Sequence, residues 1–517
     1  MKIERSKNAA RNAAYGIVLR FYVMLMPFVM RTVMVYVLGV NYLGLNSLFT
    51  SILQVLNLAE SGVGSAMVFS MYRPIAEDDA ARICALMRLY KIYYRIIGGI
   101  VFAGGMIVMP FLPYLIKSDV PADINLYTLY FLNILTTVST YWMFAYKNCL
   151  LFAHQRTDIS TKVSIATETG KYILQIITLA VFRDYYLYTI VIIMTQIINN
   201  IVTAFVVGKM YPNYTAKGKL AGEEVKAINK KIKDLFTAKL GNVIFNSTDT
   251  IVISAFMGLA VLAVYQNYFY ILTSVTSIIN IIFTSCTAGI GNSLITESRE
   301  KNYRDLKKFT LFIVWITGFC TICFLVLYQP FMKIWMTEKL MLDFRAVICF
   351  CAYFFINQIY YLLEVYKDAS GIWHEDRFRP LVVSLSNLGL NLILVQFIGI
   401  YGIILASCAA KAFIGIPWTM YNLFKIVFHK NKKDYFKKLG YYTIITVCVG
   451  AVVYFLCSCV IWEGIAGLVV KLIICLLLGN LLFFLIYRKD KEFLPLMETV
   501  KGILPQKLKG IIEFFMR

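Results

Sequence analysis

Hydrophobic residues fall in runs of about 20 that recur along nearly the whole chain, with short polar segments between them. A helix of that length crosses the hydrocarbon core of a bilayer, so the pattern predicts an all-α polytopic membrane protein. We place fourteen transmembrane helices at residues 13–38, 44–70, 88–116, 125–150, 158–182, 187–210, 234–257, 262–295, 308–331, 344–369, 380–398, 402–427, 439–461 and 465–487. Polar residues dilute 158–182 and 234–257 more than the other runs.

Positive charge is distributed unevenly around these helices. The 517-residue chain has 51 Lys and Arg against 29 Asp and Glu, a net charge of +22, and most of the cations fall in loops and ends on one side. The opposite loops hold only Lys117, Arg183, Lys333, Lys339 and Arg345. Because cytoplasmic loops collect Lys and Arg, both termini are predicted to be cytoplasmic. A nucleic-acid partner is not expected, since no basic soluble module is present.

The sequence leaves little room for catalysis or for a metal site. The predicted outer loops are too short to hold the catalytic carboxylates of a glycosyltransferase or polymerase, and no GxxxxGK[ST] loop indicates ATP hydrolysis. His154, His374 and His429 lie in three separate loops, and Cys320 and Cys323 have no second ligand pair beside them. We therefore predict a transporter that is not an enzyme and has no metal or cofactor.

The longest inner connection, 211–233, falls midway through the first twelve helices and is interpreted as a hinge between two halves. "LGVNYLGLNS" from residue 38 corresponds in position to "MGLAVLAVYQ" from 257, and "GVGSAMVF" from 62 to "GIGNSLIT" from 289, where each Gly-x-Gly is expected to end the second helix of its half. Two parallel, pseudo-symmetric six-helix lobes are the predicted result. The expected domains are an N-terminal lobe at 1–211, a C-terminal lobe at 212–428, and at 429–517 two further helices with an amphipathic tail on the inner membrane surface.

Two arginines interrupt the first apolar run. Arg20 and Arg31 are eleven residues apart, so they share one helix face at a separation of roughly 16 Å along the axis. Each could reach a headgroup region separately by snorkelling. Their alignment favours a shared, water-filled cavity instead, because a mid-membrane Arg is costly and usually faces protein or water. Arg also suits phosphate, since its planar guanidinium donates two hydrogen bonds at once.

Polar residues also follow one face of other predicted helices. The cavity-lining candidates are Asn46, Gln54 and Asn57 on the second helix, Asn242 and Asn246 on the seventh, and Asn280 on the eighth. Glu60 and Asp249 are candidate coupling or gating carboxylates, which could carry H+ or Na+ or orient an Arg. Interhelical hydrogen bonding is the alternative for the uncharged residues, and Glu168 with Lys171 is interpreted as a structural ion pair at i, i+3.

The segment "LGVNYLGLNSLF" followed by "AESGVGSA" resembles the opening of bacterial polysaccharide (Wzx-like) flippases of the multidrug/oligosaccharidyl-lipid/polysaccharide (MOP) exporter superfamily. "NSTDTIVISAFMGLAVLAVYQNYFYI" is similar to the start of the second lobe in that group. The resemblance implies a flippase in a bacterial cytoplasmic membrane, driven by an ion gradient or the membrane potential through alternating access. Its implied substrate is an oligosaccharide on undecaprenyl pyrophosphate, and its implied associates are membrane lipids, glycosyltransferases and a polymerase.

Family members hold the pyrophosphate with cations in the central cavity. By position, the resemblance carries this role to Arg20, Arg31 and Lys239, while Lys411 is a candidate without a matching motif. A lipid II flippase and a drug/cation antiporter of the same superfamily remain open alternatives. From other classes, a non-transporting scaffold of glycan assembly and a membrane glycosyltransferase or polymerase also remain.

Overall fold

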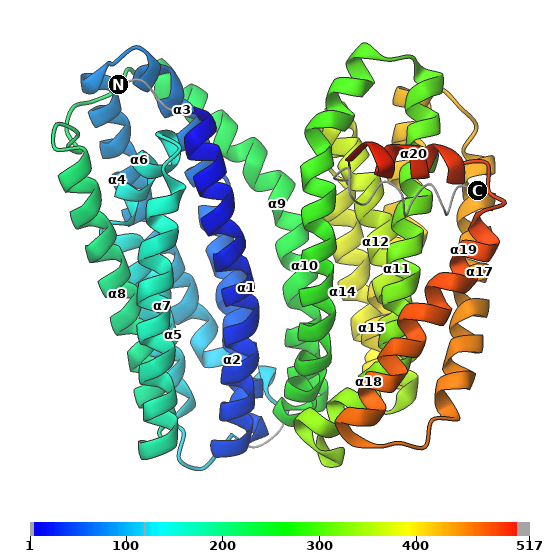
Figure 1. Ribbon diagram of the computed structural model, residues 1–517. Helices are drawn as coiled ribbons and strands as arrows, with labels where there is room; N and C mark the ends of the chain where they lie inside the picture. Colours follow the sequence, from blue (N-terminus) through cyan, green and yellow to red (C-terminus); the bar gives the residue numbers. More distant parts are fainter. Residues whose placement is uncertain (1–4, 118–119, 504–517) are drawn as a thin grey trace. The chain divides into compact units, whose positions relative to one another are not determined.

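The computed structural model describes residues 5–117 and 120–503, which form helices joined by short connections with no strand among them. The predicted all-α class is therefore confirmed. The chain divides into two compact units, unit 1 (Met1–Gln266) and unit 2 (Asn267–Arg517) (Figure 1). The boundary between the units lies at Gln266, whereas the predicted lobes end at 211 and 428. The two lobes therefore stay a prediction.

The described residues of unit 1 form nine α-helices and the start of a tenth. Its helices are α1 (Arg5–Val37), α2 (Val40–Leu56), α3 (Val63–Ala76), α4 (Ala80–Val108), α5 (Leu126–Trp142), α6 (Asn148–Ala153), α7 (Thr157–Ile177), α8 (Tyr185–Met210), α9 (Gly222–Met257) and the first residues of α10 (Leu259–Thr296). Helix α7 contacts α1 and α8, and α2 contacts α1 and α9. This set of contacts brings α1, α2, α7 and α8 around one interior space, although α1 and α7 are far apart in sequence.

Unit 2 is organised around α11 (Arg299–Met336), which contacts α12, α17, α18 and α20 (Figure 1). The other helices are α12 (Phe344–Ser370), α13 (Trp373–Asp376), α14 (Arg379–Ile398), α15 (Ile400–Ala409), α16 (Ile416–Asn422), α17 (Lys432–Ser458), α18 (Gly464–Ile474), α19 (Asn480–Tyr487) and α20 (Phe493–Ile503). The π-helix η6 (Ala410–Gly415) joins α15 to α16. Of the predicted amphipathic tail, α20 is helical, and residues 504–517 lie outside the described part of the chain.

Eleven helical segments in the described residues are long and apolar enough to cross a membrane, which makes this a multi-pass membrane protein. The three predicted crossings that are not among them, 125–150, 158–182 and 234–257, are largely helical but differ from a simple span. In the predicted crossing 125–150, helix α5 ends at Trp142, because Phe144 takes a left-handed backbone conformation with φ 59°. The other two carry polar and charged residues that lower their hydropathy. The number fourteen therefore stays a prediction.

Two local features differ from the sequence interpretation. The predicted hinge 211–233 is a connection only in its first half, since α9 begins at Gly222. The second predicted helix is interrupted at Gly62, where φ is +93° and an added Cβ would lie 2.6 Å from the Cβ of Leu235 in α9. In the second half, α10 continues through Gly289 and Gly291 without a break. The two Gly-x-Gly segments are therefore not equivalent in backbone conformation.

Gly44, in the motif that carries the family resemblance, lies at a close approach between chain segments. A Cβ at this position would overlap the backbone carbonyl of Leu259, the first residue of α10. Only glycine lets α2 approach the α9–α10 turn this closely.

Candidate functional site

A cavity of about 410 Å³ opens within unit 1 between α1, α2, α7 and α8. Its polar wall is formed by Arg31, Asn46, Thr50, Lys171, Gln175 and Tyr188, and the rest by Pro27, Met30, Met34, Leu43, Tyr172 and Ile192. Two of the residues predicted from sequence, Arg31 and Asn46, are thus brought together here from different helices. None of the described lining residues is an acid, so the wall is cationic.

Local packing and capping position the side chains of this wall. Met30 and Met34, on either side of Arg31 along α1, are 4% and 1% exposed, which anchors this part of the helix in the unit. The carboxylate of Asp184 accepts the backbone N–H of Leu187 at 2.9 Å and caps α8, one turn before Tyr188. The start of α8, and with it the place of Tyr188, is therefore fixed by a cap.

Lys171 is the second cation of the cavity. Its ammonium forms a very short ion pair with Glu168 one turn earlier on α7 and lies 4.4 Å from the centre of the Tyr172 ring. The ion pair predicted from sequence is therefore present. The sequence interpretation missed that the same ammonium shares a cavity with Arg31, because it depends on the packing of α7 against α1.

Gln175 contributes a buried acceptor to the same wall. The residue is 1% exposed, and its Oε1 accepts no hydrogen bond from any described residue. A buried polar atom without a partner costs free energy, about 1–3 kcal/mol, that a donor brought by a ligand would recover. Cations beside an amide acceptor are a suitable lining for a ligand that carries both phosphate oxygens and hydroxyl groups.

The cavity offers groups that can bind a ligand. The described lining residues include no Ser–His or Cys–His pair, and the described residues contain no group of three His, Cys, Asp or Glu that could hold a metal ion. A planar guanidinium and an ammonium that share one cavity can instead bind adjacent oxygens of a phosphate or diphosphate.

The remaining candidates in unit 1 lie elsewhere. Arg20 is exposed on α1 outside the cavity lining, and Gln54, Lys239, Asn242 and Asn246 are exposed as well. Glu60 accepts hydrogen bonds from the hydroxyls of Tyr94 at 2.7 Å and Tyr141 at 3.1 Å, and Asn57 accepts from Tyr141 at 2.9 Å. Asp249 is buried and accepts from Tyr265 at 3.3 Å. The structure does not bring these residues to Arg31, and their predicted roles stay predictions.

In unit 2, Lys411 lies in η6 and is 8% exposed. Its ammonium donates to Oδ1 of Asn357 at 2.6 Å and to the hydroxyl of Tyr353 at 3.1 Å, both on α12. Asn280, on α10, is half-buried, and its Oδ1 has no partner among the described residues. These two hydrogen bonds hold Lys411 inside the unit.

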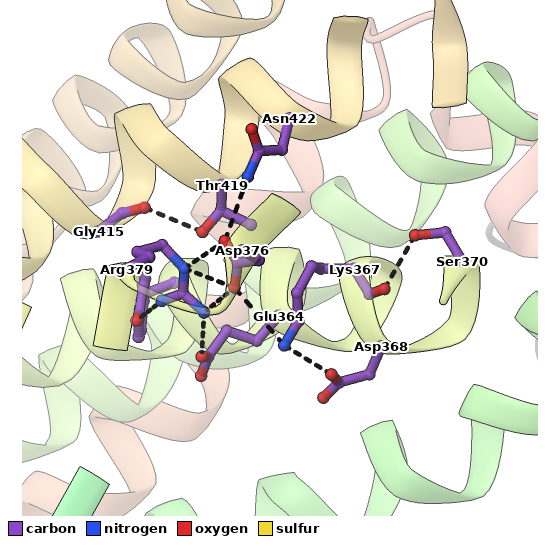
Figure 2. A network of polar contacts seen from close by, with 10 residues as sticks. Glu364, Lys367, Asp368, Ser370, Asp376, Arg379, Gly415, Thr419 and Asn422 are labelled. Atoms are coloured by element: carbon purple, nitrogen blue, oxygen red, sulfur yellow. Dashed lines mark hydrogen bonds and ion pairs between the residues drawn. The ribbon is translucent and has the colours of Figure 1, made fainter. Parts of the chain in front are cut away.

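A buried ionic cluster near Lys411 was not anticipated from the sequence (Figure 2). Arg379 is fully buried and donates to Asp376 at 2.7 Å and to Glu364 at 2.9 Å, with a further short contact to the hydroxyl of Tyr360. Asp376 also accepts from Asn422 of α16 at 3.3 Å, and Lys367 lies 3.7 Å from it. The i, i+3 spacing of Asp376 and Arg379 was the available signal, but both residues fell in or beside a predicted loop.

Comparison with known proteins supplies a family. The model of the family described as "Polysaccharide biosynthesis protein" matches residues 9–288, just over half of the chain. No curated protein matches the sequence.

Solved structures with similar folds include a flippase and multidrug transporters. A lipid II flippase, MurJ, in an inward closed conformation has 15% sequence identity and a TM-score of 0.67, covering 92% of this chain and 99% of that chain. An inward-facing multidrug resistance MATE family transporter of the MOP superfamily has 13% identity and a TM-score of 0.59, covering 79% and 98%. A mutant of the Vibrio cholerae MATE transporter VcmN has 15% identity and a TM-score of 0.53, covering 82% and 99%. At these identities the likeness concerns the fold.

Proposed function

Because the chain belongs to the polysaccharide biosynthesis protein family and has the fold of MOP superfamily transporters, we propose that it is a flippase for a lipid-linked glycan. Its substrate would be an oligosaccharide on undecaprenyl pyrophosphate, moved from the inner to the outer leaflet of a bacterial cytoplasmic membrane. Alternating access driven by H+, Na+ or the membrane potential would power the movement. Glycosyltransferases would supply the substrate, and a polymerase would consume it.

The observation that carries the proposal is the cationic cavity of unit 1. Arg31 and Lys171 line a space of about 410 Å³ with Asn46 and Gln175, and no acid is among the described lining residues. Such a wall binds a diphosphate by charge-assisted hydrogen bonds, while the amides can serve sugar hydroxyls. A drug/cation antiporter would need the opposite sign of charge in its cavity.

A lipid II flippase is the second candidate, favoured by the likeness to MurJ over 92% of this chain. Both substrates carry a polyprenyl diphosphate, so Arg31 and Lys171 suit either one, and the glycan distinguishes them. Deleting the gene in the native cell and identifying the lipid-linked glycan that accumulates on the inner leaflet would separate the two.

The direct test is Arg31→Ala in proteoliposomes that contain a fluorescent glycan on polyprenyl diphosphate. We expect outward movement of the lipid to be lost while the protein stays folded and inserted, because the cavity loses its bidentate phosphate donor. Arg73→Ala is the matched control, since Arg73 is an exposed arginine paired with Glu77 on the surface of the same unit. Normal lipid movement by Arg31→Ala would contradict the proposal.

The proposed topology has fourteen crossings in two six-helix lobes, with both termini cytoplasmic. Helices α5, α7 and α9 would be the three crossings beyond the eleven apolar segments, since each covers most of a predicted crossing. Single cysteines introduced at Arg183 and at Lys430 would then be labelled from opposite sides of the membrane.

A further inference from the structure

Lys171 is linked to Glu168 in a way that leaves its ammonium free to change partner. The two residues are one turn apart on the same helix, so their ion pair does not join separate elements of the bundle. Lys171 is 15% exposed and lines the cavity, whereas Glu168 is 31% exposed and is not among the lining residues. The ammonium therefore lies between a carboxylate outside the wall and the space that a ligand would fill.

We propose that Lys171 is the second phosphate-binding cation and that Glu168 is its resident anion, which a diphosphate displaces on binding. This inference rests on the proposed function, since it concerns the same cavity. In the empty cavity the Glu168 carboxylate accepts from the Lys171 ammonium. When substrate enters, a diphosphate oxygen replaces that carboxylate, and on release the ion pair forms again.

The chemistry of lysine suits such an exchange better than that of arginine. Its ammonium is a compact charge on a flexible four-carbon stem, with three donors that rotate freely, whereas the planar fork of Arg31 is already arranged for a fixed bidentate contact. A diphosphate also carries more negative charge than one carboxylate, so it can compete for the ammonium. Arg31 would give the permanent contact and Lys171 the exchangeable one.

The exchange of partners would lower the affinity of the cavity for its substrate, and a transporter requires a limited affinity. A site must bind substrate well enough to capture it and weakly enough to release it on the other side. Because each binding event would break an ion pair, Glu168 would subtract from the affinity that two unpaired cations would give. Glu168 would thus be a positioning residue that acts through Lys171 and does not touch the substrate.

The groups around the pair are consistent with a local exchange. On α7, Tyr172 faces Lys171, and on α1 the hydroxyl of Tyr22 donates to Thr169 at 2.8 Å, beside Glu168. Arg31 of α1 and Tyr188 of α8 line the same cavity. None of these described groups is a carboxylate, so Glu168→Gln removes the carboxylate that pairs with Lys171.

The test measures binding of glycan-free undecaprenyl diphosphate to the full-length protein in nanodiscs, with Glu168→Gln, Lys171→Met and the double variant. We expect Glu168→Gln to bind about tenfold more tightly and Lys171→Met about tenfold more weakly. The double variant should match Lys171→Met alone, because Glu168 acts only through that ammonium. Glu77→Gln breaks the surface pair with Arg73 and is the matched control, with unchanged binding expected.

Each other outcome has a distinct meaning. Unchanged or weaker binding by Glu168→Gln, with binding still lost in Arg31→Ala, would overturn the exchange and leave the proposed function standing. A double variant that binds as tightly as Glu168→Gln would also overturn it, since Glu168 would then act on another group. Absence of binding by the wild-type protein itself would count against the proposed function.

Discussion

Both units hold cations inside a helical bundle, but the partners of those cations differ. In unit 1, Arg31 and Lys171 line a cavity whose described lining residues include no acid. In unit 2, Arg379 is 0% exposed and is bonded to Asp376 and Glu364 (Figure 2). Arg31 and Lys171 face a space that a ligand can enter, whereas Arg379 is enclosed by two carboxylates.

Under the proposed function, this difference separates charges that serve binding from charges that serve folding. A buried ion pair loses several kcal/mol when one member is removed, because the other is left as an uncompensated charge. A cation at the edge of a cavity can be hydrated when its ligand is absent, so its removal affects the ligand more than the fold. A charged residue in an apolar helix is therefore not identified as a binding residue by its charge alone. The groups that contact the charge must also be known.

The largest expected effect is in the cluster of unit 2. We expect Arg379→Met to cost about 3–5 kcal/mol, because Asp376, itself 2% exposed, loses its main partner. Thermal unfolding and the yield of monodisperse protein in detergent would measure this. Arg377→Met, at an exposed arginine two residues away, is the control and should unfold like the wild-type protein. Removing both charges with Asp376→Asn and Arg379→Met should recover part of the loss, and no recovery would argue against charge as its cause.

A smaller effect separates Lys411 from Arg31. Lys411→Met should lower the free energy of unfolding by about 1–3 kcal/mol, because Asn357 and Tyr353 lose a buried partner. Arg31→Met should lower it by about 0.5 kcal/mol or less, since Arg31 is half-buried at a cavity. The same thermal-unfolding measurement compares the two. Equal losses in both variants would remove the distinction between a structural and a binding cation.

Among the three charges with a structural role, the smallest effect concerns Asp490, in the turn that leads from α19 to α20. Burial alone would raise the pKa of Asp490, but the backbone N–H of Glu492, the Tyr442 hydroxyl and Lys438 outweigh it and hold that pKa below its usual range. A lowered pKa gives stability that is present above pH ~4 and lost as the pH falls through the folded-state pKa. We expect Asp490→Asn to cost about 1 kcal/mol at pH 7.

Unfolding of wild-type protein and Asp490→Asn over a range of pH would test this. The two proteins should approach each other in stability below pH ~4, where Asp490 of the wild-type protein takes up a proton. A stability difference that does not change with pH would show that the carboxylate charge is not what holds the turn.

Much of the fold follows from hydrophobic periodicity, because each long apolar run must satisfy its backbone groups as a helix. The run predicted at 187–210 corresponds closely to α8, Tyr185–Met210. The break after Trp142 could not be predicted, because Phe144 adopts a left-handed conformation with no Gly or Pro to indicate it. The early start of α9 was missed because its first turns are charged and lack an apolar run.

Part of the candidate site could be identified from the sequence. Arg31 was identifiable because a permanent charge in an apolar run requires an explanation. Lys171 was not, since Glu168 at i, i+3 already explained its charge locally. The cluster around Arg379 joins α12, α13, α14 and α16, and no single helix of that set indicates the others. Spacing along one helix reveals local partners, whereas partners across helices require the packing.

Substitutions at Gly44 can change the distance between α2 and the α9–α10 turn. Because the carbonyl of Leu259 already fills the space of a side chain, Ala, Val and Leu at position 44 would force α2 and the α9–α10 turn apart in graded steps. A lipid-movement rate that declines with the volume of residue 44 would mean that the two segments must come together in every cycle. A lipid-movement rate that is the same across the series would mean that the contact between α2 and the α9–α10 turn does not change during transport.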